Sequence, residues 1–105
     1  MTPGRISLAL CIAFGLLSVP ARAETIQVVI DKLVFAPIDV NAKVGDTVEW
    51  VNKDALAHTA TATNNDWNVM IAPKQTGKLV LKKAGTVEYF CKFHPNMKGR
   101  VIVAP

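Results

Sequence analysis

The sequence predicts an all-β fold, an antiparallel β-sandwich, on three observations. Apolar and polar residues alternate with a period of two in most segments after residue 24, which is typical of strands. These segments are short and rich in β-branched and aromatic side chains. Turn-forming pairs such as Gly45-Asp46 and Pro95-Asn96 separate them. Short strands with frequent turns favour two sheets packed face to face.

Each predicted strand has this alternation or composition. The predicted strands cover 25–31, both sides of the Gly45-Asp46 turn within 38–52, 77–83, 86–92 and 99–105. Only 64–76 lacks a clear period, and we expect a loop there with at most one short strand. Trp50, Tyr89 and Phe35 are expected in the core, because a small core needs large apolar side chains.

Residues 1–23 are predicted to be a secretory signal peptide that is cleaved after Ala23. Arg5 precedes an apolar run from Ile6 to Val19, and the small-residue end Ala21-Arg22-Ala23 follows it. The run is shorter than the ~20 apolar residues that a membrane span needs. A retained membrane anchor is the alternative. We therefore expect a monomeric periplasmic domain of residues 24–105, with no stable membrane insertion after cleavage.

The composition of residues 24–105 argues against nucleic acid as a partner and indicates a bound metal. Ten basic and eight acidic side chains give a net charge of +2, which does not indicate a nucleic-acid binder. Cys91 is the one cysteine in this segment, so it cannot form an internal disulfide. A lone thiol in an oxidising compartment needs protection, and binding to a metal provides it.

Four residues carry the candidate chemistry. Cys91, His94 and Met97 recur at three-residue intervals in CKFHPNM, and His58, the other histidine of the chain, lies far upstream. Two imidazoles, a thiolate and a weak axial thioether are the ligand set of a blue-copper electron-transfer centre. Zinc is a poorer fit, since structural zinc sites rarely use methionine. Taken singly, each of these residues would more often be an ordinary core or surface residue.

Two stretches, FAPIDVNAKVGDTVEWVNKDALAHTAT and GTVEYFCKFHPNMKGRVIV, resemble the plastocyanin/amicyanin group of cupredoxins, with the greatest likeness to amicyanin. The resemblance implies a Greek-key β-sandwich with one copper ion at one end, bound by His58, Cys91, His94 and Met97. It also implies a soluble carrier that moves one electron between redox partners, such as a dehydrogenase and a c-type cytochrome, as the ion cycles between Cu(II) and Cu(I).

The chain departs from the group pattern in three places. Thr59 follows the first histidine where group members often have Asn, so the support of the thiolate is expected to differ. Lys92 and Phe93 lie between the cysteine and the second histidine, where amicyanins usually have a proline. Residues 63–75 match poorly, so no partner contact can be carried over to them.

An enzyme is not expected, because no spare His or Cys remains to build an open coordination position or a second metal site. The alternative function is an exported copper-binding or delivery protein, in which Met70 and Met97 would bind Cu(I). A basic rim is also expected near the metal, where it could steer an acidic partner. Its predicted members are Lys53, Lys92, Lys98 and Arg100.

Overall fold

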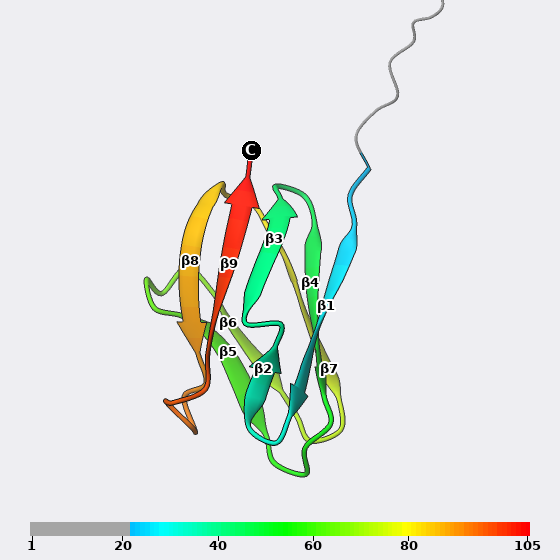
Figure 1. Cartoon of the computed structure of the whole chain (residues 1–105), viewed down its shortest axis with the longest axis vertical. Helices are drawn as coiled ribbons and strands as arrows, with labels where there is room; N and C mark the ends of the chain where they lie inside the picture. The colour runs from blue at the N-terminus through cyan, green and yellow to red at the C-terminus, as the bar shows by residue number, and fades with distance from the viewer. Residues whose placement is uncertain (1–21) are drawn as a thin grey trace, which may run out of the picture.

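The structure is a computed structural model that describes residues 22–105, so most of the predicted signal peptide lies outside the described residues. Nine strands follow one another in this part of the chain (Figure 1). They are β1 (Thr25–Asp31), β2 (Val34–Ala36), β3 (Asp39–Lys43), β4 (Thr47–Asn52), β5 (His58–Ala62), β6 (Asn68–Ile71), β7 (Thr76–Val80), β8 (Gly85–Phe90) and β9 (Lys98–Ala104). The described residues include no apolar helix long enough to cross a membrane.

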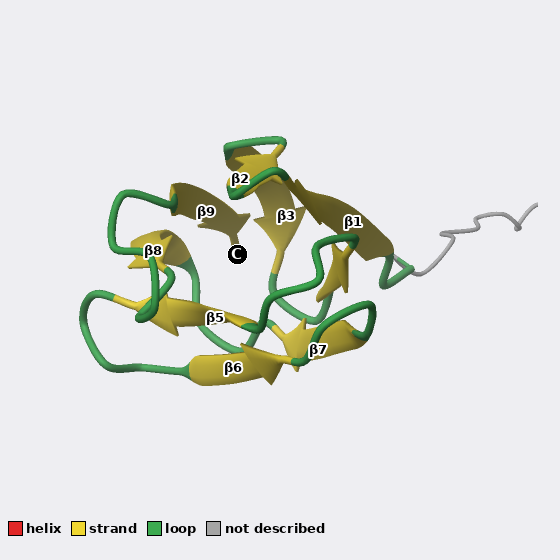
Figure 2. Cartoon of the chain, turned by 90° about the horizontal axis from the view of Figure 1, so that it is seen from below, coloured by secondary structure: helices red, strands yellow, loops and turns green. Residues whose placement is uncertain are grey.

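The strands form two sheets, which confirms the predicted β-sandwich. One sheet has the order β2-β1-β4-β7 and the other has the order β3-β9-β8-β5-β6. A view along the strands shows them arranged around a shared interior, with β6 beside β7 where the two sheets meet (Figure 2). The segment without a clear sequence period contains one short strand, β6.

Two neighbouring pairs, β1–β4 and β3–β9, are parallel rather than antiparallel. The other pairs are antiparallel, as expected. Parallel neighbours need a crossover connection, and the chain provides one by passing through β3 in the opposite sheet between β1 and β4. The sheets are therefore mixed.

The predicted core residues Trp50, Tyr89 and Phe35 are all buried. Trp50 Nε1–H donates a hydrogen bond to Tyr89 Oη at 3.1 Å, and the Phe35 ring packs edge-on against the Tyr89 ring at a centroid distance of 4.8 Å. Burial raises the pKa of Tyr89 to about 12, despite the hydrogen bond from Trp50. The phenol is therefore neutral and serves as a packing and hydrogen-bonding group.

A buried carboxylate, Asp46, lies in the turn between β3 and β4. Its Oδ1 accepts a hydrogen bond from the Glu24 N–H at 2.9 Å, and its Oδ2 accepts one from the Lys43 N–H at 2.9 Å. These two hydrogen bonds hold the pKa of Asp46 below its ordinary value of 3.8. Asp46 thus ties the start of β1 to the turn that leads into β4.

Candidate metal centre

Three of the four predicted ligands converge at the end of the sandwich where β5 begins and β8 ends, the lower end in Figure 1. His58 is the first residue of β5, Cys91 directly follows β8, and His94 lies in the loop before β9. Cys91 Sγ lies 3.7 Å from His58 Nδ1 and 3.8 Å from His94 Nδ1. The candidate ligand atoms of these residues all lie within 4.8 Å of one another.

The burial of these three side chains differs. His58 and Cys91 are fully buried, whereas His94 is only half-buried. The cluster is thus shielded on the protein side and reaches solvent through one imidazole.

The short loop from Cys91 to Met97 is closed by its own backbone hydrogen bonds. The Met97 N–H donates to the His94 carbonyl at 2.8 Å, and the Cys91 N–H donates to the Met97 carbonyl at 3.1 Å. The Met97 side chain is buried in the same cluster of core residues as Cys91. Its role as the weak axial ligand stays a prediction.

Thr59 holds the cysteine from the neighbouring strand. Its N–H donates to Cys91 Sγ at 3.4 Å, and its Oγ1 accepts a hydrogen bond from the Lys92 N–H at 2.9 Å. The sulfur and the backbone of the residue that follows it are thereby tied to β5. At the position after the first histidine, where Asn is common in the group, this chain thus offers the hydroxyl of Thr59 as the hydrogen-bond acceptor.

Asp54 orients the first histidine. Its Oδ2 lies 2.8 Å from His58 Nε2, and a carboxylate there favours the tautomer with the proton on Nε2. The lone pair then lies on Nδ1, the nitrogen that faces Cys91. This carboxylate–imidazole arrangement is common around metal-binding histidines.

The ionisation of Asp54 agrees with this role. Burial opposes its charged form, but hydrogen bonds from the Leu33 and Lys32 N–H groups and from His58 outweigh that cost. They hold the pKa of Asp54 below its ordinary value of 3.8. Asp54 is therefore ionised at neutral pH and can accept a hydrogen bond from His58 Nε2–H.

Asn52 fixes the loop that carries Asp54. Its buried Nδ2 donates to the carbonyls of Leu56 and Ala72 at 2.9 and 3.1 Å, and its Oδ1 accepts a hydrogen bond from the Asp54 N–H at 2.9 Å. The segment between β4 and β5 is thus pinned at both ends before it reaches His58.

The donor set fits a copper ion. Two imidazole nitrogens and a thiol that is free of any disulfide face one another, and soft sulfur combined with imidazole suits copper in both oxidation states. A buried thioether belongs to the same loop. No carboxylate lies among the clustered ligand atoms, so a hard oxygen-preferring ion such as Mg²⁺ or Ca²⁺ is a poor match.

The surface around the ligand loop is basic and apolar. Lys53, Lys92 and Lys98 are exposed, and Lys74 Nζ donates to the Lys53 carbonyl at 2.6 Å. Arg100, the fourth predicted rim residue, is instead engaged by Asp39 through two hydrogen bonds at 2.9 and 3.2 Å. Its charge is therefore largely neutralised.

Exposed apolar side chains lie in the loops of the same end. Leu33, Leu56 and Phe93 are 42%, 53% and 52% exposed. They belong to the β1–β2 turn, the β4–β5 loop and the ligand loop, respectively. Exposed apolar side chains therefore lie at the same end of the sandwich as the half-buried His94.

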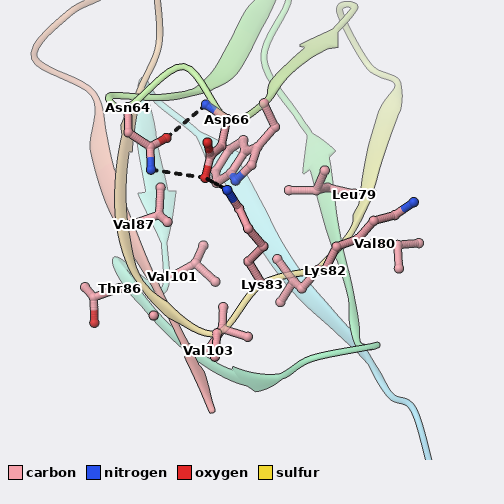
Figure 3. Close-up of a pocket in the computed structure, with 14 residues that line it drawn as sticks. Asn64, Asp66, Leu79, Val80, Lys82, Lys83, Thr86, Val87, Val101 and Val103 are labelled. Atoms are coloured by element: carbon pink, nitrogen blue, oxygen red, sulfur yellow. Dashed lines mark hydrogen bonds and ion pairs between the residues drawn. The ribbon is translucent and has the colours of Figure 1, made fainter. Parts of the chain in front are cut away.

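A cavity of about 650 Å³ lies elsewhere, lined by the loop before β6, by the segment from β7 to β8 and by two valines of β9 (Figure 3). Trp67, Leu79 and Val101 contribute to its apolar wall, and a Lys83–Asp66 ion pair of 3.2 Å lies at its polar side. None of the predicted metal ligands lines it. It is separate from the metal centre.

Comparisons with known proteins agree with this geometry. The family model described as a cupredoxin-like domain matches residues 4–103. Amicyanin of Paracoccus denitrificans is 33% identical over 84 residues, which cover 74% of this chain and 64% of that protein. The chain thus spans just under two thirds of the length of this relative.

Solved structures show the same likeness. The amicyanin structure of Paracoccus versutus has a TM-score of 0.67 and 35% identity, with 81% of this chain and 84% of that chain covered. A reduced Cu(I) form of an amicyanin variant at pH 4 has a TM-score of 0.66 and 33% identity, with 81% and 85% covered.

A β-sandwich with a His-Cys-His cluster at one end defines a copper protein of the blue-copper class. The chain belongs to the cupredoxin-like family and is similar to amicyanin.

Sequence reasoning did not identify Asp54 as a site residue. The available signal was an acidic residue four positions before the candidate histidine, in a segment expected to be a turn.

Proposed function

We propose that this protein is a periplasmic one-electron carrier that binds one copper ion through His58, Cys91, His94 and Met97, and that it is not an enzyme. The observation that carries the proposal is the convergence of two imidazole Nδ1 atoms on one buried thiol, with His94 half-exposed. A copper ion held there would supply a reversible Cu(II)/Cu(I) couple.

The residues of the chain would supply the rest of the function. Burial of His58 and Cys91 excludes water from the protein side of the ligand set. The Thr59 N–H and the Asp54 carboxylate hold the thiolate and the imidazole in place, so that little rearrangement accompanies electron transfer. The half-exposed His94 would be the electron port, and the surrounding apolar side chains would contact a redox partner.

The location is part of the same proposal. Cleavage after Ala23 would release residues 24–105 into the periplasm as a soluble domain. We expect a redox protein as electron donor and another as acceptor. By analogy with amicyanin-like proteins, these would be a dehydrogenase and a c-type cytochrome.

Titration of the purified domain with Cu(II) tests this function. We expect one equivalent of copper to produce intense visible absorption from thiolate-to-copper charge transfer, together with a reversible one-electron wave in voltammetry. Cys91→Ser should abolish the absorption, because it replaces the thiolate donor. Cys91 has no other covalent role, since it forms no disulfide.

The outcomes separate the proposal from its alternatives. A colourless protein that prefers zinc would refute the blue-copper assignment. A protein that binds Cu(I) tightly but passes the ion to a chelator, without a reversible wave, would instead support copper delivery.

A further inference from the structure

We propose that Thr61 and Asn68 are positioning residues that fix the hydrogen bonds around the Cys91 thiolate and thereby help to set the reduction potential of the centre. The effect on the potential rests on the copper-carrier function proposed above. The hydrogen bonds themselves belong to the protein alone. Neither Thr61 nor Asn68 contacts Cys91 Sγ, whose hydrogen-bond donor is the Thr59 N–H.

A continuous chain of hydrogen bonds connects the ligand loop to β6. The Lys92 N–H donates to Thr59 Oγ1 at 2.9 Å, Thr59 Oγ1 lies 2.8 Å from Thr61 Oγ1, and Thr61 Oγ1 donates to Asn68 Oδ1 at 2.6 Å. Thr59 and Thr61 are 1% and 4% exposed. Water is therefore a poor substitute for any partner in the middle of the chain.

The proton order along this chain is unique. At one end the Lys92 amide can only donate, and at the other end the Asn68 carbonyl oxygen can only accept. Because Thr61 gives its single proton to Asn68, it can only accept from Thr59. The Thr59 proton must then point to Thr61, which leaves the Thr59 lone pairs free for the Lys92 N–H.

This order has a consequence for the sulfur. If Thr61 no longer accepts, the buried Thr59 hydroxyl loses the partner of its proton, which is unfavourable, and it rotates toward another acceptor. The hydrogen bond from the Lys92 N–H to Thr59 Oγ1 then weakens. Lys92 directly follows Cys91, so this change lies next to the sulfur. The same hydrogen bond holds Lys92 against Thr59. When it loosens, Cys91 can move away from β5, and the hydrogen bond from the Thr59 N–H to Cys91 Sγ lengthens.

A weaker N–H···S hydrogen bond leaves more electron density on the thiolate. Hydrogen bonds to a ligating sulfur are one of the means by which a protein adjusts its metal. More electron density favours Cu(II) over Cu(I), so the loss of the Thr61 or Asn68 acceptor should lower the reduction potential.

The first test uses the metal-free protein and NMR of the Lys92 amide. Thr61→Val removes the hydroxyl with little change of shape, and Thr61→Ser keeps it. We expect Thr61→Val to shift the Lys92 amide proton upfield and to accelerate its hydrogen exchange several-fold, with roughly tenfold, the loss of one whole hydrogen bond, as the upper bound. Thr61→Ser should resemble the wild type. The Lys53 amide, which donates to the Ile30 carbonyl, serves as an internal control.

Asn68 provides the second pair of variants and, because it is exposed, a safeguard against misfolding. Asn68→Asp keeps an acceptor oxygen and should preserve the Lys92 amide signal, whereas Asn68→Leu removes the acceptor and should reproduce the effect of Thr61→Val. With copper bound, Thr61→Val and Asn68→Leu should both lower the potential and shift the charge-transfer band, while Thr61→Ser restores both.

A wild-type Lys92 signal in folded Thr61→Val and Asn68→Leu would overturn the proposed chain. Altered amide signals with an unchanged potential would overturn the role of these residues in setting the potential. A protein that binds no copper would overturn the proposed function and the effect on the potential together, whereas the NMR result would still decide whether Thr61 and Asn68 fix the Lys92 amide.

Discussion

The Asp54 carboxylate connects a turn of the first sheet to a candidate metal ligand, His58, of the second. Its Oδ1 accepts a hydrogen bond from the Lys32 N–H at 2.7 Å, and its Oδ2 accepts one from the Leu33 N–H at 3.1 Å as well as facing His58. The β1–β2 turn is therefore held by the same group that orients His58.

Replacing Asp54 with Asn should weaken the proposed copper site without removing a ligand. The neutral amide makes the His58 imidazole a weaker donor, and the loss of such a partner typically lowers metal affinity by about 10- to 100-fold. The reduction potential should rise, because a less electron-rich ligand set favours Cu(I). Competition with a chelator and voltammetry measure the two effects.

Asp31→Asn is the matched control. Asp31 is an exposed acid at the end of β1, so its replacement removes the same charge without touching His58. Equal effects of the two substitutions would show that general electrostatics, and not the bond to His58, is responsible.

The convergence of His58, Cys91 and His94 could be predicted from the sequence because their chemistry is visible in residue type and number, whereas Met97 as a fourth ligand stays a prediction. Two histidines, one cysteine in the domain and a nearby methionine leave few other combinations. The supporting residues Asp54, Thr61 and Asn68 could not, because an acid or hydroxyl has many available partners. Loop geometry and side-chain rotamers, which no local pattern encodes, decide among those partners.

At the level of strands, the pairing of β8 with β9 places Tyr89 opposite Gly99. A Cβ atom at Gly99 would lie 2.5 Å from the Tyr89 ring. The ring that closes the aromatic core thus needs a residue without a side chain on the next strand.

Gly99→Ala should destabilise the domain by about 1–3 kcal/mol, the usual cost of forcing extra volume into a packed core. Displacing the ring would also strain the Trp50–Tyr89 hydrogen bond. Denaturant unfolding measures the loss. In a Tyr89→Leu background the same alanine should cost much less, and an equal cost in both backgrounds would exclude the ring contact as the cause.

Most of the strands could be predicted from the sequence, but β2 and β5 lie outside the predicted segments. The direction of two strand pairings could not be predicted either. A period of two shows that β1, β3, β4 and β9 have alternate side chains on opposite faces. It does not show the direction of the neighbouring strand. That direction depends on the chain crossing from one sheet to the other between β2 and β3. Such a crossing is a property of the whole fold and leaves no local pattern in the sequence.

For the molecule as a whole, charge is unevenly placed around the proposed electron port. Lys53, Lys92 and Lys98 are exposed in or beside the loops of that end. Arg100 is compensated by Asp39. The predicted basic rim is thus reduced by one member, while Lys74 lies close enough to Lys53 to extend it.

Electron transfer to an anionic oxidant such as ferricyanide should slow as salt is raised from 0.01 to 0.1 M, because the Debye length falls from ~30 Å to ~10 Å. Lys92→Gln should reduce this salt dependence. Arg100→Gln should change it less, because Asp39 already compensates that charge. Stopped-flow rates at several salt concentrations decide the matter, and a flat profile for the wild type would indicate that the apolar surface around His94 dominates the encounter.

The hydrogen bond from the Glu24 N–H to Asp46 would change its character if the predicted signal peptide is cleaved after Ala23. The cut would convert the Glu24 amide into an α-ammonium group, and the 2.9 Å contact with Asp46 would become an ion pair with a buried carboxylate. The proteolytic step that frees the domain would then also strengthen it.

This maturation effect should be visible in denaturant midpoints of a chain that begins at Glu24, compared with the same chain acetylated on that nitrogen. The free amine should be the more stable form above the ordinary Asp46 pKa of 3.8, and the difference should vanish as the pH falls through the lowered pKa. It should also fade above about pH 8, where an ordinary α-amino group loses its proton. Asp46→Asn should abolish the difference, and equal midpoints of the two forms at neutral pH would refute it. If the difference is found, and the segment before Glu24 is removed as proposed, release and stabilisation of the domain would both follow from a single peptide-bond cleavage.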